Sequence, residues 1–463
     1  MLLGKTITEL RQMLDNKELT SEELFVFFHD RIEKYNATLN AFVTIQKSDI
    51  NAKKGVLSGI PLAIKDNFCT AGVRTTASSK VLDDFIAPYE STVTSRLKAA
   101  GYSLLGKTNM DAWAHGSSTE TSDYGATKNP WDITRSPGGS SGGTAVAVSS
   151  YLAPAGIGSE TAGSIRQPAS WSGVVGLKPT YGRVSRYGVI AMGSSLDCPG
   201  PITLSVEDAA TIFQTIAGND PYDATSSPLP IENYVKEMKE KKTYTIGIAD
   251  EYFEGLDDDV RRALDDSIKI FEKMGFKTKK VSLLSPQYSI SVYTIIQRAE
   301  VSSNLARYDG IRYGNPRTHF GSEAKRRSML GTYTLSYGYY DAFYKKAQKV
   351  RTLIINDFKR VFKEVDFIIG TPSPITAIKL GDFEKYPFFG ELMDKFNEPG
   401  AMAGIPGINL PVGLDRNGLP IGMQLMANYF RESDLLNASY QFEKETDFMG
   451  VIKKGVKNLN LET

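Results

Sequence analysis

The chain is poor in cysteine and histidine, and neither sign of charge prevails. Its two cysteines, Cys69 and Cys198, cannot build a disulfide framework, so we expect ordinary buried thiols in a reducing compartment. Its 54 basic and 53 acidic side chains balance, which leaves no global field to attract nucleic acid. No apolar run is long enough to span a membrane, and no secretory leader opens the sequence. We therefore predict a soluble cytoplasmic protein without membrane contact, or a mitochondrial-matrix protein if the chain comes from an organelle.

The shortage of histidine narrows the chemistry further. His29 falls in an amphipathic helical segment and His319 in a polar stretch, and no two histidines have the spacing of zinc ligands. A Ser-His-Asp triad would need His115, and the chain has no GxSxG nucleophile elbow. A serine nucleophile here therefore needs a base other than histidine. We predict no metal site.

One segment has the letter pattern of a phosphate-binding loop in the wrong context. Residues 101–108, GYSLLGKT, would bind phosphate only if a strand preceded the first glycine and a helix followed the lysine. Instead a helical segment precedes Gly101, and the apolar run YSLL is a predicted strand. We therefore predict no nucleotide site in this segment.

Apolar periodicity predicts helices alternating with strands. A capping box of Thr20 and Glu23 lies in an N-terminal helical region of about residues 5–38. Further helices are predicted around 257–275 and 338–364, and strands at NAFVTI, GIPLAI, YSLLG, TYTIGIA, FKTKKVSL, FIIGTPSP, GINLPVG and PIGMQLMA. This alternation is typical of an α/β protein with a sheet covered by helices. A turn-rich connector at about 219–231 could separate domains, but the late strands could equally complete the first sheet. We predict one domain over 1–463.

Lys65 is a candidate base at the end of the apolar strand in GIPLAIKDNF. Holding a lysine neutral at pH 7 costs roughly 4.6 kcal/mol relative to its ordinary pKa. Burial can depress a lysine pKa by up to about 3–5 units, so a dry pocket suffices. Asp66 need not neutralise Lys65, because consecutive side chains of a strand point to opposite faces. Taken alone, Lys65 is more simply a strand-end lysine that reaches solvent.

Two glycine- and serine-rich segments supply candidate nucleophiles. SPGGSSGGT contains Ser140 and Ser141, and GSETAGSIRQP places Ser164 at a turn just before a predicted helix. A row of backbone N–H groups at such a turn can stabilise an oxyanion. The alternative is a pair of flexible linkers. Apolar segments flank both stretches, which favours rigid turns inside a core.

These segments, together with GVVGLKPTYGRVSRYG, resemble the amidase-signature family in their order and spacing. The resemblance implies an α/β amidase-signature fold, with a mixed central sheet covered by helices on both faces and a signature core over about 55–205. It implies a Ser-Ser-Lys triad: Ser164 is the nucleophile, Ser140 bridges it to the base after a cis peptide bond, and Lys65 is the base. The implied oxyanion hole is the backbone of Thr161, Ala162, Gly163 and Ser164.

Three further segments resemble one branch of the family, the A subunits of tRNA-dependent amidotransferases. They are NMDAWAHGSSTETSDYGATKNPWD, SSNLARYDGIRYG and KRRSMLGTYTLSYGYYDAFYKKAQKVRTLI. The branch implies hydrolysis of glutamine to glutamate and ammonia, which amidates Glu-tRNA(Gln), Asp-tRNA(Asn) or both. It implies no cofactor in this chain, since ATP and Mg would bind the partner B subunit. It also implies a heterotrimer with B and C subunits, with the tRNA held mainly by the partner.

The resemblance also implies a charged clamp for glutamine. Asp394 would bind the α-ammonium and Arg327 the α-carboxylate, with Arg326 as the alternative cation. Isolated residues of these types are usually solvated surface charges, but the sequence around them is apolar and glycine-rich.

Three positions depart from the pattern of the family or branch. Glu160 replaces an aspartate, Ala162 replaces a glycine, and His115 stands where the branch commonly has methionine. The alanine is tolerable unless its backbone needs a positive φ. Glu160 and Ala162 give a little weight to a catalytically weak scaffold subunit that docks partners, while a free-standing amidase for small or aryl amides remains the enzymatic alternative.

Overall fold

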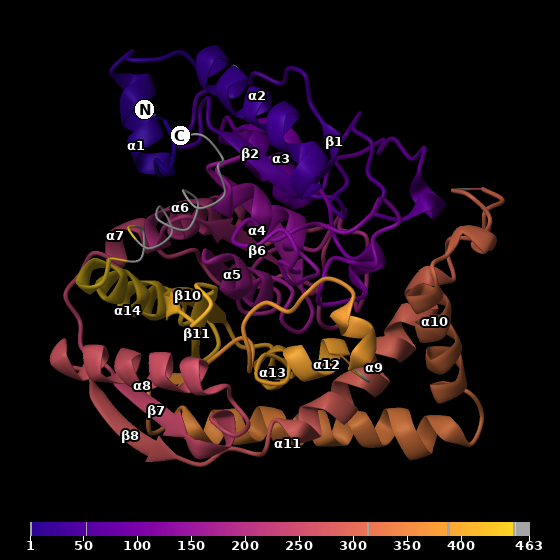
Figure 1. The fold of residues 1–463 in the computed structure, drawn as a ribbon. Helices are drawn as coiled ribbons and strands as arrows, with labels where there is room; N and C mark the ends of the chain where they lie inside the picture. Colours follow the sequence, from indigo (N-terminus) through magenta and orange to yellow (C-terminus); the bar gives the residue numbers. More distant parts are fainter. Residues whose placement is uncertain (1, 52, 313, 387–388, 448–449, 451–463) are drawn as a thin grey trace.

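The computed structural model describes residues 2–51, 53–312, 314–386, 389–447 and 450 of the chain. Figure 1 shows the order of the elements along the chain. The strands are β1 Phe42–Ile45, β2 Pro61–Lys65, β3 Ser103–Thr108, β4 Ala155–Glu160, β5 Val175–Lys178, β6 Cys198–Thr203, β7 Thr245–Ala249, β8 Lys277–Val281, β9 Phe367–Gly370, β10 Gly407–Leu414 and β11 Pro420–Ala427. The α-helices are α1 Ile7–Asp15, α2 Ser21–Leu39, α3 Thr92–Ala99, α4 Gly142–Ser149, α5 Arg166–Ser172, α6 Val206–Ile216, α7 Tyr234–Glu237, α8 Asp258–Lys273, α9 Gln287–Leu305, α10 Ser322–Thr334, α11 Lys346–Val361, α12 Phe389–Met393, α13 Glu398–Ala403 and α14 Glu432–Glu445.

The described strands form one mixed sheet in the order β1-β3-β2-β4-β6-β5-β10-β11-β9-β7-β8. β2 pairs in parallel with β3 and β4, and β7 pairs in parallel with β8 and β9. The central pairs from β4 through β6, β5, β10 and β11 to β9 are antiparallel. Strands from both ends of the chain therefore share one sheet, and the late strands complete the sheet that the early strands begin.

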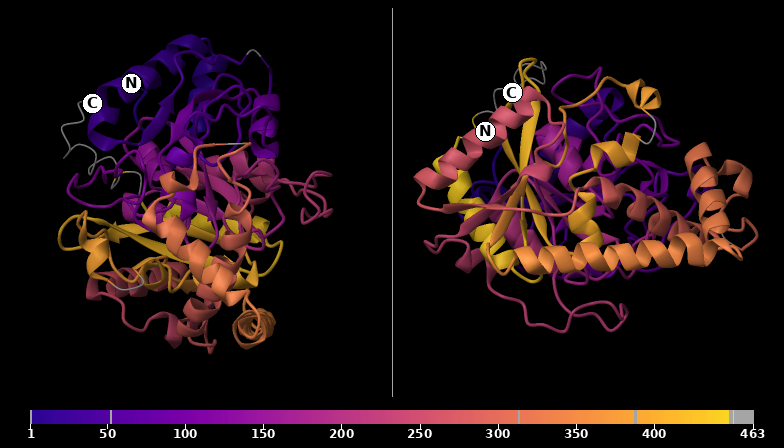
Figure 2. Two further views of the ribbon diagram at one scale, coloured as in Figure 1. Left: turned by 90° about the vertical axis from the view of Figure 1, so that its right-hand side faces the viewer. Right: turned by 90° about the horizontal axis from the view of Figure 1, so that it is seen from below.

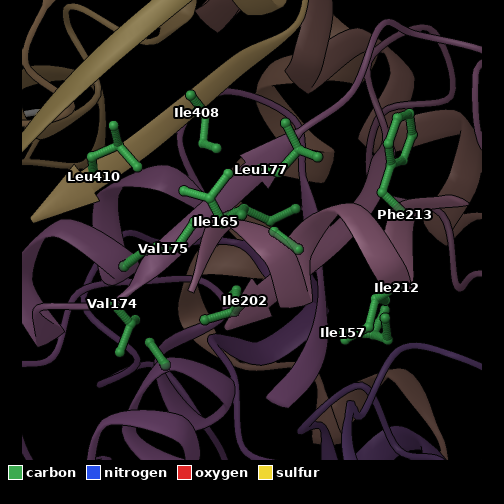
Figure 3. Close-up of a cluster of buried hydrophobic side chains, with 14 of the residues drawn as sticks. Ile157, Ile165, Val174, Val175, Leu177, Ile202, Ile212, Phe213, Ile408 and Leu410 are labelled. Atoms are coloured by element: carbon green, nitrogen blue, oxygen red, sulfur yellow. The ribbon is translucent and has the colours of Figure 1, made fainter. Parts of the chain in front are cut away.

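Helices cover the sheet in two groups. The central helices α4 and α5 pack together against the middle strands, while α6, α8 and α14 form a second contiguous group on β5, β6, β10 and β11. The core between them is aliphatic: Ile157 on β4, Ile165, Ile202 on β6 and Ile408 on β10 are fully buried and gather in Figure 3. The predicted α/β fold with a helix-covered mixed sheet is confirmed.

The predicted strands are all present, and one helix differs from its prediction. The segment around 338–364 begins with a π-helix, Tyr340–Lys345, before α11. Gly338, at φ 81°, breaks the chain direction between α10 and this turn. Because of that break, α10 and α11 form an angled pair that projects beyond the sheet in Figures 1 and 2. Within the described residues, none of the helices is both long and apolar enough to cross a membrane.

Candidate active site

Lys65 and Ser140 meet in the centre of the molecule. Lys65 is the last residue of β2, a strand whose residues are all buried, and its side chain has no exposed surface. Its Nζ lies 2.8 Å from Ser140 Oγ and donates to the carbonyl oxygen of Ser159 at 3.0 Å. The Gly139–Ser140 peptide bond is cis, as the resemblance predicts. The two residues are therefore placed for a proton to pass between hydroxyl and amine.

The burial of Lys65 changes its protonation. Desolvation lowers the pKa of Lys65 to about 7, although the carboxylates of Asp111, Asp197 and Glu160 favour the charged form. Asp66, the residue after the strand, points elsewhere: its carboxylate accepts hydrogen bonds from the backbone N–H groups of Thr76 and Ser78. Lys65 can therefore act as a base near neutral pH.

Ser164 lies in the turn between β4 and α5. The N–H of Ser141 donates to the carbonyl of Ser164 at 3.1 Å, which holds the turn after Gly139 against the turn that carries Ser164. Ser140 and Ser164 are thus brought close by the backbone around them. Lys65 and Ser140, more than seventy positions apart along the chain, are in direct contact, and the backbone link from Ser141 places Ser164 in the neighbouring turn.

The backbone of the same turn presents free donors. The carboxylate of Glu160 accepts from the N–H groups of Ile165 and Arg166, each at 3.1 Å. Within the described parts of the chain, no group accepts a hydrogen bond from the N–H groups of the four preceding residues, Thr161, Ala162, Gly163 and Ser164. These are the residues predicted to form an oxyanion hole.

Glu160 and Ala162 fit this turn. Glu160 forms a fully buried ion pair with Arg166, and the Nε of Arg166 donates to Glu160 Oε1 at 2.9 Å. The longer acidic side chain therefore braces the first turn of α5. Ala162 does not have a positive φ, so its Cβ is not strained. Gly163 is required for space, because a Cβ there would overlap the carboxylate of Asp394.

Ser164 lines a narrow pocket with a cavity volume of about 10 Å³, and Arg327 and Asp394 line the same pocket. Its lining residues are Ala114, Gly116, Ser117, Ser164, Met192, Tyr293, Arg327, Gly390, Glu391 and Asp394. Opposite charges stand on its walls, one from α10 and one from the segment after α12.

Arg327 is the arginine of α10 that faces the pocket. Its side chain is buried, and Nε donates to Glu323 Oε1 at 2.5 Å. Among the described residues, no hydrogen-bond acceptor contacts its two terminal nitrogens, so they remain available to a carboxylate. Arg326, the alternative, is exposed and pairs with Glu323 outside the pocket, so the structure does not bring it to the site.

Asp394 is buried against the Ser164 turn. Its Oδ2 accepts from the hydroxyl of Ser117 at 2.7 Å, and Oδ1 contacts Asn397 Nδ2 at 3.4 Å. Burial raises the pKa of Asp394 to about 7, the Ser117 hydrogen bond lowers it, and Glu160 raises it further. A cation arriving beside it would favour the ionised form.

Sequence reasoning missed two polar side chains of the pocket. Ser117 orients Asp394, and the Tyr293 hydroxyl on α9 lies 3.0 Å from Thr161 Oγ1 beside the predicted oxyanion hole. Ser117 stands within a segment that carries the resemblance, so its position there was a usable signal. Tyr293 lies nine residues before the SSNLARYDGIRYG segment, which begins on the same helix, and no motif marks its own position.

His115 is buried between the pocket-lining residues Ala114 and Gly116, and its imidazole ring is neutral. Burial lowers its pKa well below the ordinary value, and Arg327 and Arg298 lower it further. Neither ring nitrogen has a hydrogen-bond partner among the described residues. His115 does not contact the Lys65–Ser140 pair in any hydrogen bond of the described chain, so it does not replace Lys65 as the base.

Lys107, the lysine of GYSLLGKT, is buried and already hydrogen-bonded within the protein. Lys107 has no exposed surface, and its Nζ donates to the carbonyl of Phe68 and to the hydroxyl of Thr75. Gly101 has a φ of 95° just beyond α3, and β3 follows it. Lys107 therefore fastens the loop after β2 and cannot reach a phosphate group.

Comparisons with known proteins agree with this geometry. The model of the family described as Amidase matches residues 23–436. The chain is 47% identical to the A subunit of the glutamyl-tRNA(Gln) amidotransferase of Thioalkalivibrio sulfidiphilus, over 97% of this chain and 99% of that protein. It is 48% identical to the same subunit of Halothermothrix orenii, over 96% and 97% of the two chains. The crystal structure of this subunit from Thermotoga maritima matches with a TM-score of 0.85 at 39% identity, over 96% of this chain and 95% of that one. The resemblance predicted from the sequence is confirmed, and the chain belongs to the amidase family.

Proposed function

We propose that this protein hydrolyses the side-chain amide of glutamine and is the ammonia-producing subunit of a tRNA-dependent amidotransferase. The observation that carries the proposal is one pocket in which Ser164 lies beside a buried cation and a buried anion, Arg327 and Asp394. Glutamine has an α-carboxylate and an α-ammonium at a fixed distance from its amide. The names of the similar subunits support the same activity.

The proposed chemistry uses Ser164 as the nucleophile. Neutral Lys65 accepts a proton from Ser140, which takes one from Ser164 as its oxygen attacks the amide carbon. The N–H groups of residues 161–164 stabilise the negative oxygen that forms. The C–N bond then breaks, and the proton returns through Ser140 to the departing ammonia. Water attacks the resulting ester by the same relay and releases glutamate.

Removing either charge of the clamp should separate glutamine from simple amides. Removing one member of a desolvated charge pair typically costs about 2–5 kcal/mol, so Asp394→Asn and Arg327→Ala should each lower kcat/KM for glutamine by about 30-fold or more, chiefly through KM. A simple amide without α-groups should be hydrolysed about as before. Arg326→Ala is the matched control, because that neighbouring arginine faces away from the pocket. Equal losses on both substrates would show that the clamp residues support the fold alone.

The pH dependence should also differ between the two substrates. Lys65, whose pKa is lowered to about 7, must be neutral, and Asp394, whose pKa is raised to about 7, must be ionised to bind an ammonium. As pH falls below about 7, log kcat/KM should therefore drop with a slope of about two for glutamine and about one for a simple amide. In Asp394→Asn both substrates should show the smaller slope. Identical slopes in the unmodified protein would argue against the ammonium role of Asp394.

We propose that the ammonia amidates Glu-tRNA(Gln), or Asp-tRNA(Asn), at a partner B subunit that binds ATP and Mg, in a heterotrimer that also contains a C subunit. The subunit names of the relatives imply a complex of several chains. Helix α10 projects in Figure 2, and Met329, Tyr333 and Tyr337 on α10 and the turn after it are exposed apolar or aromatic side chains that a partner subunit could cover. The proposed complex is tested by measuring amide transfer to charged tRNA, first with the reconstituted subunits and then with this chain alone.

The free-standing amidase is the competing activity, and the clamp weighs against it. An enzyme for simple or aryl amides has no use for a buried arginine whose terminal nitrogens lack a described partner. Efficient hydrolysis of simple amides together with weak glutamine turnover by the reconstituted complex would favour that alternative.

A further inference from the structure

Arg298 on α9 contacts both walls of the pocket. Its backbone lies directly against α10, because a Cβ on Gly331 would overlap the carbonyl oxygen of Arg298. Gly331 follows Arg327 by one helical turn on α10. The backbone of Arg298 is thus packed against the helix that carries the cationic half of the clamp.

The side chain of Arg298 reaches the opposite wall. Its NH2 donates to Glu391 Oε1 at 2.7 Å, and both side chains are buried, 3% and 5% exposed. Glu391 lies on α12, lines the pocket, and precedes Asp394 by three residues. One residue therefore connects the helix of Arg327 to the segment of Asp394.

Two buried arginines near the pocket each pair with a different glutamate. Arg327 is paired with Glu323 through Nε, while Arg298 is paired with Glu391. Glu398 also lies nearby, but both of its carboxyl oxygens are buried without a hydrogen-bond partner among the described residues. Buried ion pairs contribute little net stability compared with apolar residues of similar size. A geometric role explains this pair better than a contribution to stability.

We propose that the Arg298–Glu391 ion pair is a strut that fixes the distance between the two walls of the pocket, and that this distance selects the length of the substrate side chain. The proposal rests on the glutaminase function proposed above. Ser164 sits on a braced turn in the core, so the position of the clamp relative to Ser164 decides how many methylenes fit between α-carbon and amide. Glutamine and asparagine differ by one methylene, and a fitted pocket discriminates such a difference by roughly 10–200-fold. Arg298 and Glu391 are positioning residues.

The test compares a change of length with a change of charge at one position. Glu391→Asp keeps the charge but shortens the strut by one methylene, while Glu391→Gln keeps the length and a hydrogen-bond acceptor but loses the charge. The ratio of kcat/KM for glutamine to that for asparagine should fall about tenfold in Glu391→Asp and stay within about threefold of the unmodified protein in Glu391→Gln. The rate for a simple amide, measured in all three proteins, reports any general loss of activity, and the change in the glutamine-to-asparagine ratio is read against it. Arg298→Lys, which shortens the other arm and keeps both charges, should repeat the effect of Glu391→Asp.

Controls separate this role from general damage. Arg31 is a buried arginine far from the pocket that donates to the carbonyls of Ser150 and Tyr151, so Arg31→Lys should leave the substrate ratio unchanged. Melting temperatures identify any variant that fails to fold. If one of the two shortened variants, Glu391→Asp or Arg298→Lys, does not fold, the substrate ratio in the other one decides the test. An unchanged ratio in the folded shortened variants, or an equal fall in Glu391→Gln, would overturn the strut. If the unmodified protein releases ammonia from neither amino acid, the proposed function fails instead.

Discussion

Replacing Ser164 by alanine is expected to lower ammonia release from glutamine by roughly 10⁴-fold or more, because the acyl-enzyme cannot form without its oxygen. Ser164 is nearly buried at a turn where the N–H groups of residues 161–164 have no acceptor in the described chain. Removing one hydroxyl there leaves the turn intact, since Glu160 and Arg166 hold it. Steady-state release of ammonia from glutamine is the measurement.

Two serines nearby provide comparisons. Ser140→Ala should be almost as damaging, because it breaks the contact with Lys65 Nζ. Ser141→Ala is the matched control: its hydroxyl donates to the carbonyl of Ser159, and its backbone N–H, which contacts Ser164, is kept. Ser141→Ala should therefore lose far less activity. Near-normal turnover in Ser164→Ala would rule out Ser164 as the nucleophile.

Lys65→Arg is expected to inactivate the protein at every accessible pH even though it keeps the positive charge. Lysine can deliver a neutral amine here because burial lowers its pKa to about 7, whereas arginine stays protonated. The expected loss is of the same order as that of Ser164→Ala, on the order of 10⁴-fold. Rates measured from about pH 6 to about pH 10 should show no recovery in the variant.

A structural cation would behave differently at this position. If Lys65 only held the carbonyl of Ser159, arginine would preserve that contact and much of the rate. Melting temperature serves as the check, because arginine adds volume to a fully buried position. A folded Lys65→Arg protein that retains most of its turnover would remove Lys65 from the chemistry.

The proposed triad could be selected from the sequence because its residues lie in long, distinctive segments. Ser140 and Ser164 stand in glycine-rich turns, and Lys65 ends an apolar strand, so both local pattern and family resemblance pointed to them. Strand β2 was predictable for a related reason, since it is an apolar run with all residues buried, whereas β4, β5 and β6 were not among the predicted strands. The same local pattern alone would have assigned Lys107 to phosphate. The helix that precedes Gly101 and the strand that carries Lys107 argue against that assignment.

The strut and the finer geometry of the clamp were not predictable. Arg298 and Glu391 are 93 positions apart and meet only because α9 and α12 pack on the same pocket. Which of two adjacent arginines faces inward depends on the rotation of α10, which a short amphipathic pattern does not fix. The π-helical start of the segment at 340–345 likewise has no distinctive sequence signal. Contacts between segments distant in the sequence decide the first two.

The most direct test of Ser164 as the nucleophile is to identify the residue that carries the acyl group. We propose acid quenching during glutamine turnover, followed by proteolysis and mass spectrometry of the peptides. The account predicts one glutamyl group in ester linkage on Ser164, present with glutamine and absent in Lys65→Arg. A glutamyl group on another side chain, such as Ser140 or the buried Cys69, would contradict it.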